Sequence, residues 1–86
     1  MKILAIQGSD LRKVNFKTDT TLLLAAEAQK RGYRIFYYER QKISFSNGKV
    51  IALCKYIKIN YGKKKFFTSL KTINFNLENS NIILIR

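Results

Sequence analysis

The sequence predicts an α/β domain with a mostly parallel sheet, which opens with a βαβ unit and carries an antiparallel hairpin insertion. Three observations support this fold class. The run "KILAI" at residues 2–6 is typical of a buried strand, a capped helix pattern lies near residues 19–31, and Tyr33–Tyr38 is typical of a second strand. Within this second strand, we expect one of Tyr37 and Tyr38 to face inward and the other outward. Because a strand, helix and strand in this order almost always form a right-handed crossover between parallel strands, we expect the first two strands to be parallel.

The helix is bounded by capping signals at both ends. Thr18 or Asp19 can accept hydrogen bonds from the unpaired amides of a first helical turn, a contribution of roughly 1 kcal/mol. We interpret Asp19 as such a cap rather than as a ligand. Gly32 can take the left-handed conformation that ends a helix. The face expected to be buried consists of Leu22, Ala25, Ala26 and Gln29, and Leu24 and Ala28 are expected to widen it.

The second half of the chain has a different pattern. Asn47-Gly48 between two β-prone runs is the strongest short signal for a hairpin. The segment 61–78 begins with a turn at Tyr61-Gly62 and continues as a strand or a short helical piece, of which we favour the strand. The run "IILI" near the C-terminus predicts another buried strand. This C-terminal strand could pair with the first strand on the side opposite the second strand. The strand order is then 2-1-3, with the C-terminal strand as the third, and a crevice forms at the carboxyl ends of the first and third strands.

The charge balance admits two interpretations. Seventeen Lys and Arg against five Asp and Glu leave a formal charge of +12, which is a signature of nucleic-acid binding. The chain is also rich in Ile and Asn, as expected of A+T-rich coding DNA, and its lysines are dispersed, so we favour compositional drift. The alternative function is a small basic module that stacks single-stranded RNA on aromatic residues such as Tyr56 and Phe66. A third interpretation is that the chain is a relic or partial gene product that folds but has no function.

Several classes of protein are disfavoured by composition. The apolar run in the opening "MKILAIQGSD" is too short for a signal-peptide core, and no apolar run in the chain reaches membrane-spanning length. We therefore expect a cytoplasmic protein. The chain has no histidine and a single cysteine, Cys54, which we expect to be a buried small hydrophobe. No glycine-rich phosphate loop or paired carboxylates indicate a site for ATP or magnesium in this chain.

Four segments together resemble one known family. They are "VNFKTDTT" at residues 14–21, "EAQKRGYRIFYY" at 27–38, the hairpin "SNGKVIA" and the terminal "IILIR". The sequence resembles the N-terminal domain of bacterial glutathione synthetase, a member of the ATP-grasp ligases. It departs from the family pattern at Gly8-Ser9-Asp10, where the family usually has Met-Asp-Pro.

The resemblance implies a pre-ATP-grasp, Rossmann-like fold over residues 1–86, as a fragment that lacks the two ATP-grasp domains. It implies a ligase in which ATP phosphorylates the cysteinyl carboxylate of γ-glutamylcysteine and the amine of glycine attacks the acyl phosphate. ATP and Mg²⁺ would be cofactors of the full-length enzyme and would not be bound by this chain alone. The implied partners are γ-glutamylcysteine, glycine and further copies in a homo-oligomer, with no specific nucleic acid and no membrane.

The candidate substrate-binding residues are Arg86, Asn15 and Ser9. A dianionic dipeptide requires a fixed planar cation and short hydroxyl or amide donors, which these residues would supply at the predicted crevice. From the sequence alone, Arg86 is either a carboxylate clamp or a solvated chain end, while Ser and Asn are also ordinary turn residues. The resemblance favours the clamp.

Overall fold

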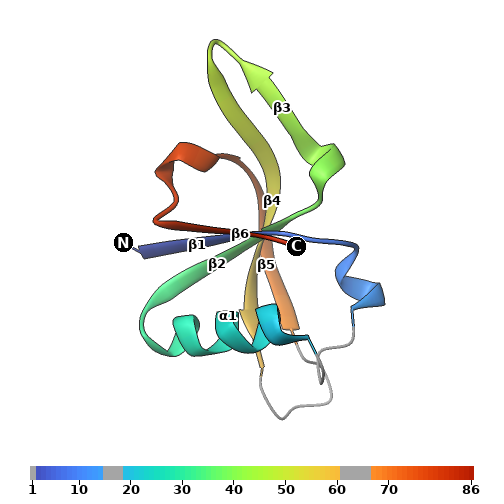
Figure 1. The fold of residues 1–86 in the computed structure, drawn as a ribbon, viewed down its shortest axis with the longest axis vertical. Coiled ribbons are helices and arrows are strands. Elements are labelled where there is room, and N and C mark those ends of the chain that lie inside the picture. The colour runs from blue at the N-terminus through green and yellow to red at the C-terminus, as the bar shows by residue number, and fades with distance from the viewer. Residues whose placement is uncertain (1, 15–18, 61–66) are drawn as a thin grey trace.

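In the part of the chain that the structure describes, a mixed sheet carries one long helix on one of its faces (Figure 1). The computed structural model describes residues 2–14, 19–60 and 67–86. The elements follow in the order β1 (Lys2–Gln7), η1 (Leu11–Lys13), α1 (Thr20–Lys30), β2 (Tyr33–Tyr38), η2 (Arg40–Lys42), β3 (Ile43–Ser46), β4 (Lys49–Ile59), β5 (Phe67–Asn76), η3 (Leu77–Asn79) and β6 (Ile82–Ile85), where η marks a short 3₁₀ helix. No helix within the described ranges is long and apolar enough to cross a membrane.

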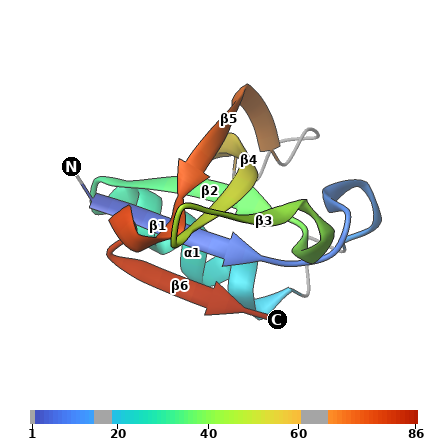
Figure 2. The same ribbon diagram turned by 90° about the horizontal axis from the view of Figure 1, so that it is seen from above.

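The βαβ opening and the 2-1-3 order are confirmed. β1 pairs with β2 in parallel, with Leu4 opposite Ile35, and with β6 in parallel on its other edge, with Leu4 opposite Ile82. Figure 2 shows β6 beside β1 at one side of the sheet and β5 at the other. The carboxyl ends of β1, β2 and β6 therefore meet at one edge.

The prediction of a mostly parallel sheet is not confirmed. Between the described strands, the pairings β2–β4, β3–β4 and β4–β5 are antiparallel, against two parallel pairings. The reason is the length of β4. Its residue Ile51 pairs with β3 and β5, whereas Ile57 pairs with β2 and β5. Because a strand has two edges, β3 and β2 share one edge of β4, and the hairpin becomes part of the main sheet.

The local turn signals are confirmed. Gly32 has φ +91° directly after α1, and Asn47 and Gly48 have φ 51° and 75° between β3 and β4. Figure 1 shows this hairpin projecting away from α1. The strand favoured within 61–78 is β5, while the predicted turn at Tyr61-Gly62 lies outside the described residues.

Two apolar clusters, one on each face of the sheet, form the core. On the α1 face, Leu22, Ala25 and Ala26 of the helix pack on strand residues that include Ile35 and Tyr37. Ala28 also packs against this cluster, but Leu24, which was expected to widen the buried face, is 57% exposed. Gln29 also joins α1 to β4, because its side-chain amide donates to the Ile59 carbonyl and accepts from the Ile59 amide, at 3.0 and 2.8 Å. The second cluster consists of Ile3, Ala5, Phe36, Tyr38, Ala52, Cys54, Phe75 and Leu77.

Burial corrects two expectations. Neighbouring strand residues Tyr37 and Tyr38 were expected to face inward and outward, but both are buried, on opposite faces, because residues of β5 and η3 cover the second face. The C-terminal strand was expected to be buried, yet Ile83 is 42% exposed and Ile85 is 70% exposed. β6 pairs on one edge with β1 and is the last strand on that side of the sheet, which leaves its side chains half covered.

Candidate functional site

The candidate site lies where β1, β2 and β6 reach their carboxyl ends. Two backbone hydrogen bonds extend the sheet past its regular strands: the Gly8 amide donates to the Tyr38 carbonyl at 3.0 Å, and the Arg86 amide donates to the Gln7 carbonyl at 3.1 Å. In Figure 2, β1 and β6 run side by side toward this edge. The loop that begins at Gly8 and the side chain of Arg86 therefore start from neighbouring positions.

Arg86 is held by a buried carboxylate. Its Nη2 forms an ion pair with Oδ2 of Asp19, whose side chain is 4% exposed, while the Arg86 side chain is 34% exposed. The other carboxylate oxygen, Oδ1, accepts a hydrogen bond from the Leu22 amide at 3.0 Å. The predicted cap is thus confirmed, and the same side chain also orients the guanidinium. The ion pair joins residues from opposite ends of the chain, so no local sequence signal indicated it.

Tyr37 connects the other parts of the site. Its hydroxyl donates to the Ser9 carbonyl at 2.6 Å. Burial raises the pKa of this phenol, and the positive charge of the Arg86 guanidinium opposes that rise. The hydroxyl therefore stays protonated at neutral pH and can act as a donor. The sequence marked Tyr37 only as a strand residue, and its alternation in β2 carried no sign of this role.

The predicted site residues fall into two groups. Ser9 and Arg86 both lie near Tyr37: the Ser9 backbone carbonyl accepts a hydrogen bond from the Tyr37 hydroxyl, and the Arg86 guanidinium opposes the rise in the pKa of that phenol. Ser9 is itself exposed. Asn15 lies outside the described residues, so its predicted place in the crevice stays a prediction.

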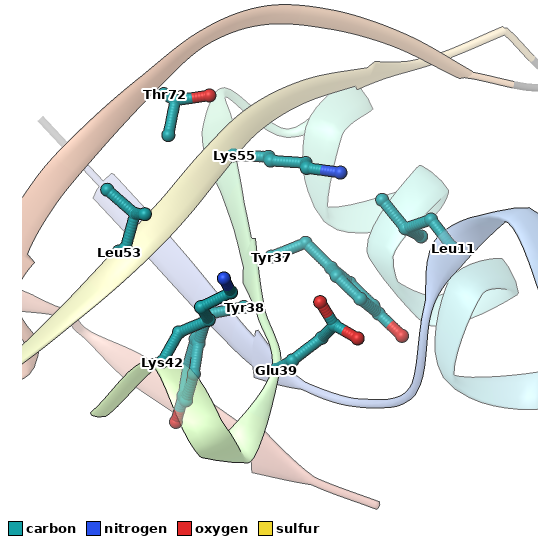
Figure 3. Close-up of a pocket in the computed structure, with 8 residues that line it drawn as sticks. All are labelled: Leu11, Tyr37, Tyr38, Glu39, Lys42, Leu53, Lys55 and Thr72. Carbon is teal, nitrogen blue, oxygen red and sulfur yellow. The ribbon is translucent and has the colours of Figure 1, made fainter.

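A cavity of about 200 Å³ lies beside Tyr37, which forms part of its wall (Figure 3). Lys55 stands opposite Tyr37 in the pairing of β2 with β4, which places their side chains on the same face. The cavity therefore combines apolar walls with charges of both signs. Its lining residues are Leu11, Tyr37, Tyr38, Glu39, Lys42, Leu53, Lys55 and Thr72.

Three carboxylates in the described part of the chain are each engaged by an arginine. Asp10 pairs with Arg12 at 2.7 Å, and this contact holds the pKa of Asp10 well below its usual range. Asp19 is engaged by Arg86, and Glu27 lies 3.6 Å from Arg31 on α1. Within the ranges that the structure describes, no three metal-ligating side chains gather. Magnesium needs several oxygen ligands in one place, so the residues present here do not fit ATP with Mg²⁺.

Cys54 is a buried free thiol, as predicted. Burial raises its pKa to about 12. A thiol that holds its proton is a poor nucleophile and a poor metal ligand. Cys54 therefore acts as a packing residue.

The RNA-binding alternative receives no support. Phe36 is 4% exposed and packs edge-on against Phe75 and Tyr56, at ring-centre distances of 4.7 and 5.3 Å. A ring used in this way cannot present its face to a base. Tyr61 and Phe66 lie outside the described residues.

Comparison with known proteins points to one family. The family model described as "Prokaryotic glutathione synthetase, N-terminal domain" matches residues 1–86. The chain is 32% identical over 83 residues to a glutathione synthetase of Wigglesworthia glossinidia brevipalpis, covering 96% of this chain and 26% of that protein. It is 29% identical over 86 residues to a glutathione synthetase of Agrobacterium fabrum, covering 100% of this chain and 27% of that protein. The chain thus spans about a quarter of the length of these curated relatives, and it belongs to the family of prokaryotic glutathione synthetase N-terminal domains.

Proposed function

We propose that this chain is the substrate-side domain of a glutathione synthetase, a ligase that joins γ-glutamylcysteine to glycine with hydrolysis of ATP. Family membership supports the reaction, and the placement of Arg86 supports the role. Its guanidinium lies at the carboxyl edge of parallel strands, the edge at which open α/β sheets bind their ligands. The strand order β2-β1-β6, with α1 as the crossover, also supports a pre-ATP-grasp, Rossmann-like classification of this part of the fold.

Arg86 has donors to spare for a substrate carboxylate. A guanidinium carries five N–H donors, and Asp19 engages one end of it. The partly exposed remainder can form the paired, charge-assisted hydrogen bonds that guanidinium groups make with carboxylates. A carboxylate of γ-glutamylcysteine is the proposed partner, with donors of Ser9 and Asn15 as further contacts.

ATP and Mg²⁺ belong elsewhere in this proposal. The carboxylates described above do not gather into a metal site, so we assign nucleotide and metal binding to the ATP-grasp domains of a complete ligase. Glycine is the second substrate of that complete enzyme. The length of the relatives supports this assignment, since this chain spans 26% and 27% of two of them. A cytoplasmic location and a homo-oligomeric enzyme are further parts of the same proposal.

The test is Arg86→Ala in the complete ligase that contains this domain. A hydrogen bond to a charged group contributes about 1.5–3 kcal/mol, so KM for γ-glutamylcysteine should rise about tenfold to 150-fold while KM for ATP stays within about twofold. Arg86→Lys should fall between, because it keeps the charge and loses the planar fork. Lys49→Ala, which removes one positive charge next to the hairpin turn, is the matched control. An unchanged KM for the dipeptide, or equal rises for both substrates, would refute the clamp.

A further inference from the structure

Arg86, Ser9 and Asn15 leave the ammonium group of γ-glutamylcysteine without a counter-ion. The dipeptide carries an α-ammonium group as well as its two carboxylates. An ammonium group donates hydrogen bonds and accepts none, and a carboxylate is the acceptor that binds it most strongly. The five Asp and Glu residues of the chain are therefore the candidates for this contact.

Glu39 is the carboxylate that combines a free charge with the right place in the sheet. Three of the five acidic residues already form ion pairs with an arginine, namely Asp10, Asp19 and Glu27. Glu78 lies in η3, which precedes β6, and so it belongs to the opposite edge of the sheet. Glu39 directly follows β2, at the carboxyl edge. Within the described residues it forms no ion pair, and its Oε1 accepts one hydrogen bond of 3.3 Å from Gln41.

Glu39 shares the cavity beside Tyr37 with two lysines. Tyr37 of β2 pairs with Lys55 of β4, and Lys55 pairs in turn with Thr72 of β5, so a row of polar side chains crosses three strands on one face. Lys42 reaches the same cavity from η2. Figure 3 shows the side chains of Glu39, Lys42 and Lys55 directed toward a common space. In the part of the chain that the structure describes, neither lysine forms an ion pair.

These charges suit an α-amino-acid group. Such a group carries an ammonium and a carboxylate on one carbon, so it requires an anion and a cation close together. Glu39 supplies the anion, and Lys42 and Lys55 supply the cation with a surplus of positive charge, which favours a ligand with more carboxylates than ammonium groups. The volume of about 200 Å³ is below the range of about 300–1,000 Å³ of drug-sized sites, and it fits an amino-acid residue better than a nucleotide.

The cavity and Arg86 lie on either side of the end of β1. The Arg86 amide donates to the Gln7 carbonyl, and the Gly8 amide donates to the carbonyl of Tyr38, which lines the cavity. Two strand spacings, about 10 Å in total, therefore separate the backbones of Arg86 and Tyr38. An extended γ-linked dipeptide together with the long arginine side chain can bridge this separation.

We propose that Glu39 binds the α-ammonium group of γ-glutamylcysteine, and that the γ-glutamyl end of the dipeptide lies in this cavity with its α-carboxylate beside Lys55. This inference rests on the proposed function, because it places one end of the same substrate. Arg86 then binds the dipeptide from the other side of β1.

The experiment uses Glu39→Gln in the complete ligase, with Glu78→Gln as the matched control. Glutamine keeps the shape of the side chain and loses its charge, so KM for γ-glutamylcysteine should rise about fivefold to 50-fold while KM for ATP stays within about twofold. The control should leave both constants unchanged. The second probe is N-glutarylcysteine, which is the same dipeptide without its amino group. The unmodified enzyme should prefer γ-glutamylcysteine to this analogue, and Glu39→Gln should lose that preference, because the lost charge and the lost ammonium form one interaction.

Lys55→Met tests the placement of the α-carboxylate. It should raise KM for γ-glutamylcysteine about threefold to tenfold. Lys58→Met is its control, since Lys58 is an exposed lysine of the same strand that does not line the cavity.

The outcomes separate this inference from the proposed clamp. If Arg86→Ala leaves KM for the dipeptide unchanged, the clamp is refuted, whereas a lost preference in Glu39→Gln still supports the ammonium contact. If Arg86→Ala raises KM but Glu39→Gln keeps its preference for the substrate with the amino group, the clamp stands and this inference is overturned. A Lys55→Met enzyme that behaves like Lys58→Met would also overturn it, since the γ-glutamyl end would then lie outside the cavity.

Discussion

Replacing Asp19 with alanine removes two interactions at once, the cap of α1 and the buried partner of Arg86. Loss of an N-cap costs about 1 kcal/mol. Breaking a fully buried ion pair costs about 3–5 kcal/mol. Because solvent screens the partly exposed Arg86, we expect the loss of this ion pair to cost about 1–2 kcal/mol. The expected sum is about 2–3 kcal/mol of unfolding free energy. In a domain of this size it corresponds to a fall of about 10–20 °C in melting temperature.

Asp19→Asn separates the two contributions. Asparagine caps helices about as well as aspartate, so this variant should lose only the ion pair, about 1–2 kcal/mol. Asp10→Ala is the control, because Asp10 also caps a short helix and pairs with an arginine, yet Arg12 is 83% exposed. Urea unfolding followed by circular dichroism measures all three variants. Equal losses for Asp19→Ala and Asp19→Asn would refute the cap, and a loss no larger than that of Asp10→Ala would refute both contributions.

Four further predictions follow from the fold. Gly48→Ala should cost about 1–2 kcal/mol in urea unfolding, because φ 75° is strained for alanine, whereas Lys49→Ala should cost little. Cys54 should resist thiol reagents at pH 8 until urea is added. Since burial raises its pKa from 9.0 to about 12, stability should fall as pH rises above about 9, less so in Cys54→Ala. Calorimetry of the 86-residue chain with ATP and Mg²⁺ should show no saturable micromolar binding, and such binding would overturn its substrate-side role. Binding to single-stranded RNA should be weak and vanish with salt, whereas salt-resistant binding reduced by Tyr56→Ala would restore the stacking alternative.

The amino-acid sequence by itself determined the elements that depend on near neighbours. The Asp19 cap, the Gly32 stop and the Asn47-Gly48 turn are each set by the backbone preferences of a few adjacent residues, and all three formed where the sequence indicated. The parallel pairing of β1 and β2 followed as well, because a strand, a helix and a strand in succession form a crossover that brings the second strand back in the same direction. The resemblance to glutathione synthetases could also be recognised from short contiguous segments of the sequence.

Only the tertiary structure decided which strand edges meet and which side chains share a site. A strand pattern indicates that a segment pairs but not with which partner. The sequence therefore could not predict that β2 and β3 share one edge of β4, or that β6 is exposed. The same limit applies to the site. Arg86 met Asp19, and Tyr37 met Ser9, because parallel strands from distant parts of the chain end at a common edge. Such contacts depend on the assembled sheet, and no local preference of the residues involved encodes them.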